Sequence, residues 1–209
     1  MFPVGHIAYS YGAVHVLSRC FAGRFDADYR WLALAALLPD VLDKPLALTV
    51  FRDSQTSQGL AHALVVHVIV AAIAWLLWRS RSLPYLLAFS GHLVLDQIWR
   101  HPATLFYPFM GWQFDPYKFM GTPQAMASVY WDIFLLPQIW IAEVVGLAVL
   151  AFFVVHYQLY RRPGLLCFVR SGRFQQAAGA QACLVRTTVS AAQPGGADRD
   201  TAARRQESP

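Results

Sequence analysis

Five apolar segments, separated by short polar stretches, occupy most of the first 160 residues. Residues 60–78 and 126–160 each contain enough apolar positions to cross a bilayer, which takes about 20 helical residues. The other three segments are shorter or more polar, and we expect them to be embedded only by packing inside a bundle: residues 4–22, 30–43 and 83–99. The pattern predicts an all-α, polytopic membrane helix bundle of about five helices, in which Pro39 disturbs the last turn of the second helix.

Two stretches do not fit the helical pattern. Residues 100–125 are rich in aromatic residues, proline and glycine, which favours an ordered or re-entrant loop at the membrane interface. Residues 171–209 lack apolar periodicity and are expected to be disordered. The sequence therefore predicts a membrane-embedded domain over residues 1–160 and a basic, disordered tail over residues 161–209.

Composition supports a membrane protein. The chain is 56% hydrophobic and 14% charged, against roughly 45–50% and 25% for soluble domains. The net charge of +5 comes entirely from residues 161–209, so the folded part lacks the basic surface that a nucleic-acid-binding domain needs. The three cysteines show no C-x-x-C spacing, which argues against a disulfide framework or a thiolate metal site.

The positions of arginine and lysine predict an orientation in the membrane. Most arginines follow the first, third and fifth segments: Arg19, Arg24, Arg30, Arg79, Arg81, Arg161, Arg162, Arg170 and Arg173. The opposite loops contain fewer basic residues: Lys44, Arg52, Arg100 and Lys118. Because basic loops stay in the cytoplasm, we expect an outer N-terminus and a cytoplasmic tail in an inner membrane protein.

In this topology, candidate metal ligands from four segments lie near the outer side of the membrane. They are His6, Asp40, Asp43, His62, His92 and Asp96. The topology is derived from the positions of arginine and lysine alone, so this convergence is an independent result. The i,i+4 spacing of His92 and Asp96 places both on one helix face, as does the i,i+3 spacing of the two earlier aspartates. Imidazole and carboxylate ligands favour zinc, manganese or iron over calcium, and this set is large enough for one or two divalent ions.

The same residues lie in motifs of a known family. "LLPDVLDKPL", "GLAHAL" and "GHLVLDQIWRHPATLFYPF" occur in the order found in the LexA-binding, inner membrane-associated hydrolases, and the resemblance covers about residues 3–115. Members are also called membrane-bound metal-dependent hydrolases. The resemblance implies metal-ligand roles for the six residues named above. The sequence departs from the commoner pattern at Lys44, Gln58 and Ala63, where relatives often carry histidine, arginine and serine.

We therefore expect a membrane hydrolase in which a metal-activated water attacks a phosphoester or other ester of a lipid or lipid-linked substrate. Proton transfer is assigned to Asp40, Asp43 or His101. A metal transporter or a non-catalytic metal-binding membrane protein is the main alternative. A phosphohistidine lipid phosphatase fits less well, because His92 would have to serve two motifs and no Lys-x6-Arg-Pro motif is present.

Overall fold

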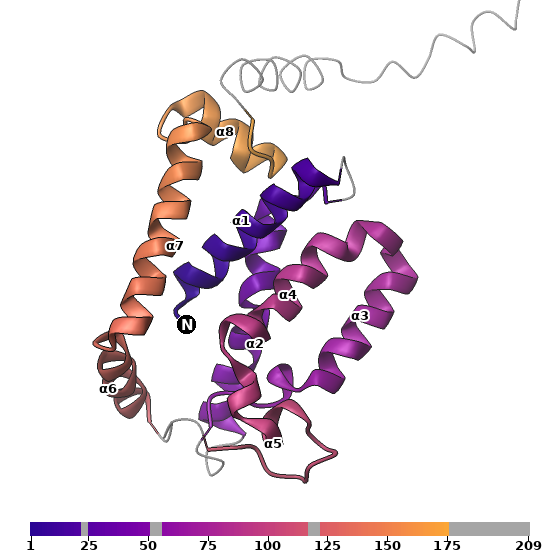
Figure 1. Ribbon diagram of the computed structural model, residues 1–209, viewed down its shortest axis with the longest axis vertical. Helices are drawn as coiled ribbons and strands as arrows, with labels where there is room; N and C mark the ends of the chain where they lie inside the picture. Colours follow the sequence, from indigo (N-terminus) through magenta and orange to yellow (C-terminus); the bar gives the residue numbers. More distant parts are fainter. Residues whose placement is uncertain (22–24, 51–55, 117–121, 176–209) are drawn as a thin grey trace, which may run out of the picture. The chain divides into compact units, whose positions relative to one another are not determined.

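The computed structural model describes residues 1–21, 25–50, 56–116 and 122–175. The regular secondary structure of these residues is helical (Figure 1). The α-helices are α1 (Pro3–Cys20), α2 (Tyr29–Thr49), α3 (Leu64–Trp78), α4 (Leu83–Leu95), α5 (Pro102–Leu105), α6 (Pro123–Phe134), α7 (Pro137–His156) and α8 (Arg162–Ser171). Short 3₁₀ turns lie between some of them: η2 (Leu60–His62), η3 (Arg79–Ser82) and η4 (Ile98–Arg100). The expected all-α class is confirmed over these residues.

The chain divides into two compact units, Met1–Phe152 and Phe153–Pro209. The first unit contains α1 to α6 and most of α7. In the described part of the second unit, the rings of Tyr157 and Phe168 both stack on Phe174, with ring centres 5.0 and 4.9 Å apart. The candidate site lies entirely in the first unit.

Two helical runs are long and apolar enough to cross a membrane, judged by length and composition: Leu64–Leu95 and Pro137–His156. The first run is not straight. Its backbone turns at η3, where Arg79 has a φ of 51°, so α3 and α4 form an antiparallel hairpin (Figure 1). The expected bundle of five spanning helices is not confirmed, although α1 and α2 are present as helices.

Helix α2 is central in the first unit, because it packs against both α1 and α4. Its side chains Leu32 and Ala36 are fully buried in these contacts. Two hydrogen bonds tie its first turn to the neighbouring helices. The Tyr11 hydroxyl of α1 donates to the Tyr29 carbonyl (2.7 Å), and the Asp28 N–H donates to the Tyr85 hydroxyl of α4 (3.0 Å).

Three boundaries differ from the sequence prediction. Helix α2 continues through Pro39 to Thr49, so the proline does not end it. The predicted segment 126–160 is divided, because α6 ends at Phe134 and α7 begins at Pro137, a position where proline suits a helix start. Part of the tail predicted to be disordered forms α8, while residues 176–209 lie outside the described residues.

Candidate metal centre

Helix α4 presents His92 and Asp96 at its C-terminal end. The i,i+4 spacing puts both side chains on one face, with His92 Nε2 3.5 Å from Asp96 Oδ2. Asp96 is the C-cap residue, and the left-handed Gln97 (φ 53°) ends the helix after it. The His92 ring is oriented by α2, since its Nδ1 donates to the Ala36 carbonyl (2.8 Å). A carbonyl oxygen only accepts, so the proton of a neutral His92 is on Nδ1 and Nε2 faces the cluster.

Asp43 of α2 organises the turn that carries His62. Its Oδ2 accepts hydrogen bonds from the Gly59 N–H (2.8 Å) and from His62 Nδ1 (2.7 Å), while its Oδ1 accepts from the Ala61 N–H (2.9 Å). With both oxygens engaged, Asp43 directs His62 rather than facing the cluster. A carboxylate bound to the outer nitrogen of a histidine is the usual arrangement behind a metal-ligating imidazole.

His67 of α3 supports the same turn from outside the cluster. Its Nε2 donates to the Ala61 carbonyl (2.9 Å), and its ring stacks on Phe89 with ring centres 4.2 Å apart. His67 therefore supports the backbone of η2 and does not belong to the group whose ligand atoms converge.

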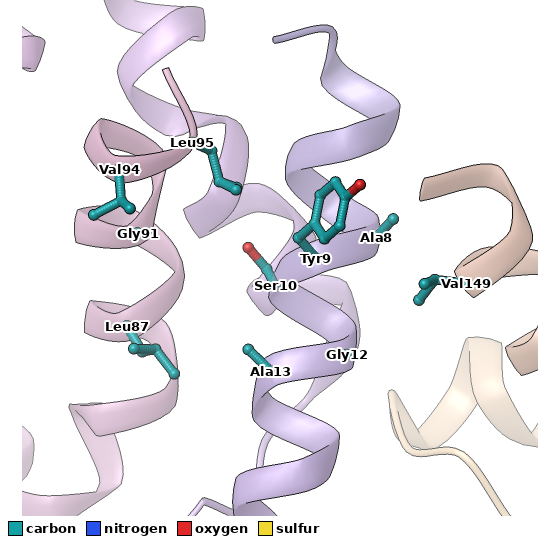
Figure 2. Close-up of a pocket in the computed structure, with 10 residues that line it drawn as sticks. All are labelled: Ala8, Tyr9, Ser10, Gly12, Ala13, Leu87, Gly91, Val94, Leu95 and Val149. Carbon is teal, nitrogen blue, oxygen red and sulfur yellow. The ribbon is translucent and has the colours of Figure 1, made fainter. Parts of the chain in front are cut away.

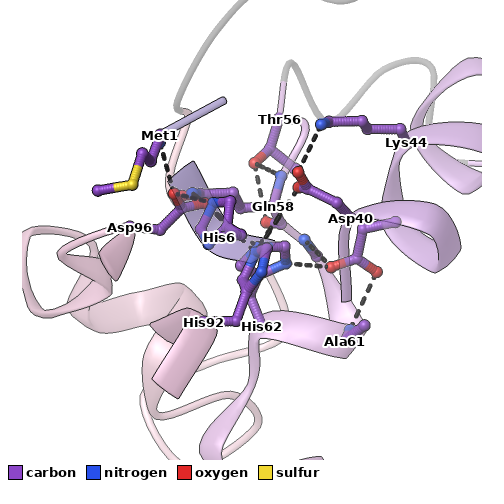
Figure 3. A network of polar contacts seen from close by, with 12 residues as sticks. Met1, His6, Asp40, Lys44, Thr56, Gln58, Ala61, His62, His92 and Asp96 are labelled. Carbon is purple, nitrogen blue, oxygen red and sulfur yellow. Dashed lines mark hydrogen bonds and ion pairs between the residues drawn. The ribbon is translucent and has the colours of Figure 1, made fainter. Parts of the chain in front are cut away.

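Four side chains from α2, η2 and α4 meet in one place (Figure 3). One ligand atom from each lies within 4.8 Å of all the others: Asp40, His62, His92 and Asp96. Asp40 Oδ1 lies 3.9 Å from His62 Nε2 and 3.8 Å from His92 Nε2. Ligands 2.0–2.2 Å from a single ion are separated by distances of this order, so the cluster has the size of one coordination sphere.

His6 of α1 completes the cluster. Its ring is fully buried and stacks on the His92 ring with centres 4.0 Å apart, and its Nε2 lies 3.1 Å from Asp96 Oδ1. Within the described residues neither ring nitrogen of His6 has a hydrogen-bond partner. The contact of His6 Nε2 with Asp96 is close but does not have hydrogen-bond geometry, and a coordinated cation would satisfy the nitrogen that faces the cluster.

The Nε2 nitrogens of His62 and His92 face each other at the centre of the cluster. The two Nε2 atoms are only 3.2 Å apart, although both rings direct their Nδ1 protons outward. Burial alone would lower the pKa of His62, but the carboxylates of Asp43 and Asp96 raise it to about 9. Burial alone would raise the pKa of Asp96, but the imidazoles around it hold that pKa well below its ordinary value. The imidazole nitrogens and carboxylate oxygens gathered here form a donor set that suits a divalent cation.

Of the six predicted ligands, five surround this point, and the sixth, Asp43, stands directly behind His62. His101, predicted as a proton-transfer candidate, is the half-buried N-cap residue of α5 and is outside the group of four whose ligand atoms converge. Its catalytic role stays a prediction.

Sequence reasoning missed three groups that contact the cluster. Gln58 Nε2 donates to Asp96 Oδ2 (3.1 Å), and the α-amino group of Met1 donates to Asp96 Oδ1 (2.6 Å). Lys44 Nζ donates to Asp40 Oδ2 (2.6 Å) and lies over the Tyr130 ring (Figure 3). Lys44 was detectable, because it follows Asp40 by four residues on a helix, but only as an ion pair.

Helices of membrane-spanning length and a buried centre of imidazoles and carboxylates are typical of an α-helical membrane protein with a functional polar site. The chain belongs to the YdjM inner membrane protein family, whose sequence model matches residues 1–164 and so includes every residue of the centre. Comparisons with curated proteins and with solved structures found no match.

We predict that purified protein retains about one equivalent of a transition metal, because the donors form one coordination sphere. His92→Ala and Asp96→Ala should abolish this content in elemental analysis. Asp43→Asn should leave the ligands in place but lower metal affinity about 10- to 100-fold, the usual cost of losing a residue that orients a ligand. His156→Ala, in the second unit, is the control. Full metal content in both ligand variants would contradict the assignment.

Proposed function

We propose that the protein is a membrane-bound metal-dependent hydrolase acting on a phosphoester or other ester of a lipid or lipid-linked substrate. The observation that carries this proposal is the convergence of three imidazoles and two carboxylates, with the imidazole nitrogens of His62 and His92 facing each other 3.2 Å apart. The motif resemblance to metal-dependent membrane hydrolases supports the same activity, and the arginine distribution supports a site near the outer face with the tail in the cytoplasm.

The proposed centre holds one zinc, manganese or iron ion. Its ligands are His6, Asp40, His62, His92 and Asp96, and Asp43 orients one of them. When bound, such an ion supplies Lewis-acid activation of a water molecule and of the scissile ester.

Asp40 and Lys44 are the residues of this chain that we assign to proton transfer and charge stabilisation. Asp40 directs Oδ1 toward the cluster and holds Oδ2 against Lys44 at 2.6 Å, so this carboxylate is placed to accept a proton from water at the centre. The Lys44 ammonium is half-buried and stands beside the centre, where it would stabilise negative charge on a phosphoryl oxygen. This positive charge favours an anionic phosphoester over a neutral ester.

An apolar cavity lined by residues adjacent in sequence to two of the ligands supports a lipid substrate. It has a volume of about 520 Å³ and is lined mainly by small and aliphatic residues of α1 and α4, with Tyr9 and with Val149 of α7 (Figure 2). Gly91 and Leu95 in its wall directly precede His92 and Asp96 in α4. A Cβ added at Gly91 would meet nothing within 4 Å, so the cavity is open there. An acyl or prenyl chain in this cavity would bring its ester group toward the ligands.

Purified protein in detergent should release product from a long-chain lipid phosphoester, and a chelator should abolish this turnover because the centre depends on its ion. Asp40→Asn should lower turnover about 100-fold or more, because Asp40 is the residue assigned to proton transfer. Turnover that survives chelation would refute the proposal. Metal uptake into proteoliposomes without any ester turnover would establish the transporter alternative instead.

Lys44→Met should lower kcat for an anionic phosphoester about 100-fold, since a preorganised positive charge is lost. The same variant should keep its metal, because Lys44 is not a ligand. A neutral carboxyl ester of equal chain length serves as the control substrate and should be affected much less. Equal losses for both substrates would remove Lys44 from charge stabilisation.

Gly91→Leu should fill the cavity and lower kcat/KM for a long-chain phosphoester by about tenfold, while a water-soluble short-chain ester is cleaved at the normal rate. Ala74→Leu is the matched control, since Ala74 lines a different apolar cavity between α2, α3 and α4. An unchanged preference for long chains in the Gly91 variant would show that the substrate chain lies elsewhere.

A further inference from the structure

Glu143 is a buried carboxylate in the otherwise apolar helix α7, and the proposed chemistry does not use it. Its residue exposure is 7%, and its helix is one of the two runs that can cross a membrane. An ionisable group at such a position is expensive to bury and needs partners.

The partners of Glu143 are backbone donors at the start of α1. Oε1 accepts the N–H of Phe2 at 2.7 Å, and Oε2 accepts the N–H of Gly5 at 2.9 Å. Phe2 is the N-cap residue of α1, and it provides no side-chain cap of its own. Glu143 therefore caps α1 from another helix, and its negative charge suits the positive end of the helix dipole.

The two helices are also in close contact around this cap. A Cβ added at Gly146 would lie 3.2 Å from Gly5 Cα, so only a glycine fits at this distance without displacement. One turn further along α1, the Tyr9 hydroxyl donates to the Ala142 carbonyl (2.9 Å). The first turns of α1 are thus fixed on the face of α7 that carries Glu143.

The residue after Gly5 is His6, whose position depends on this first turn. Neither nitrogen of the His6 ring has a hydrogen-bond partner in the described part of the chain, so hydrogen bonds do not orient the ring as they orient His62 and His92. Its place is set by the α1 backbone, by stacking on His92 and by the 3.1 Å contact of its Nε2 with Asp96 Oδ1. We infer that Glu143 is a positioning residue, which caps α1 so that His6 Nε2 faces the metal centre.

This inference rests on the metal centre of the proposed function and is independent of catalysis. The test is a cobalt titration of the full chain in detergent, following cobalt affinity and the visible absorption of the bound ion. Glu143→Ala should lower cobalt affinity about 10- to 100-fold and change the spectrum, as His6→Ala does, because a ligand is no longer held in place.

A double-mutant cycle separates positioning of His6 from general packing. If Glu143 acts through His6, Glu143→Ala should have less than about a twofold effect in the His6→Ala background. Tyr9→Phe is the matched control, because it removes a neighbouring hydrogen bond between α1 and α7 without touching the cap. It should leave cobalt affinity within about twofold of wild type. If Glu143→Ala does not fold, Glu143→Gln, which keeps one acceptor oxygen, is used in the same cycle with a smaller expected loss.

The outcomes are distinct. Wild-type protein that binds no cobalt would refute the metal centre itself. Wild-type binding with an unchanged Glu143 variant, or a full Glu143 effect in protein that lacks the His6 side chain, would overturn the positioning role alone.

Discussion

Imidazoles and carboxylates can be buried together in an apolar helical protein only when each group has a partner, and this requirement shapes the structure from α1 to α4. The Nδ1 atoms of His62 and His92 are satisfied by Asp43 and by the Ala36 carbonyl. Their Nε2 atoms are left facing one another, and the His6 ring beside them has no hydrogen-bond partner within the described residues. A cation at this point would bind the nitrogens of all three rings at once.

The three aspartates of the centre differ in the hydrogen bonds that they accept from groups other than the ligands. Asp43 is bound on both oxygens by the η2 turn, so it is a structural anchor for His62. Asp40 shares its charge between the cluster and Lys44, and Asp96 is surrounded by imidazoles and by the donors Gln58 and Met1. Identical side chains thus take different positions in the centre because their neighbours differ.

Much of the centre could be predicted from the sequence, because its members lie near the ends of helices and two of them are spaced i,i+4. Helical periodicity places His92 and Asp96 on one face but does not determine which carboxylate faces the centre, so Asp43 and Asp40 looked equivalent. The two aspartates differ because the backbone N–H groups of the η2 turn donate to Asp43. The position of such a short turn could not be predicted, because its sequence shows no apolar periodicity.

Helix α2 continues past Pro39 because packing against α1 and α4 outweighs the lost hydrogen bond. The partner of Glu143 lies 138 residues away in the chain and left no local signal.

Helix α7 carries none of the motifs, but its Glu143 fixes the first turn of α1. We propose above all that imidazole nitrogens and carboxylate oxygens share one ion. X-ray absorption spectroscopy of the protein as purified tests this most directly. We predict a first shell of nitrogen and oxygen atoms at about 2.0–2.2 Å, with the outer-shell scattering of two or three imidazole rings and no sulfur. A first shell that contains sulfur, or one without imidazole scattering, would contradict it.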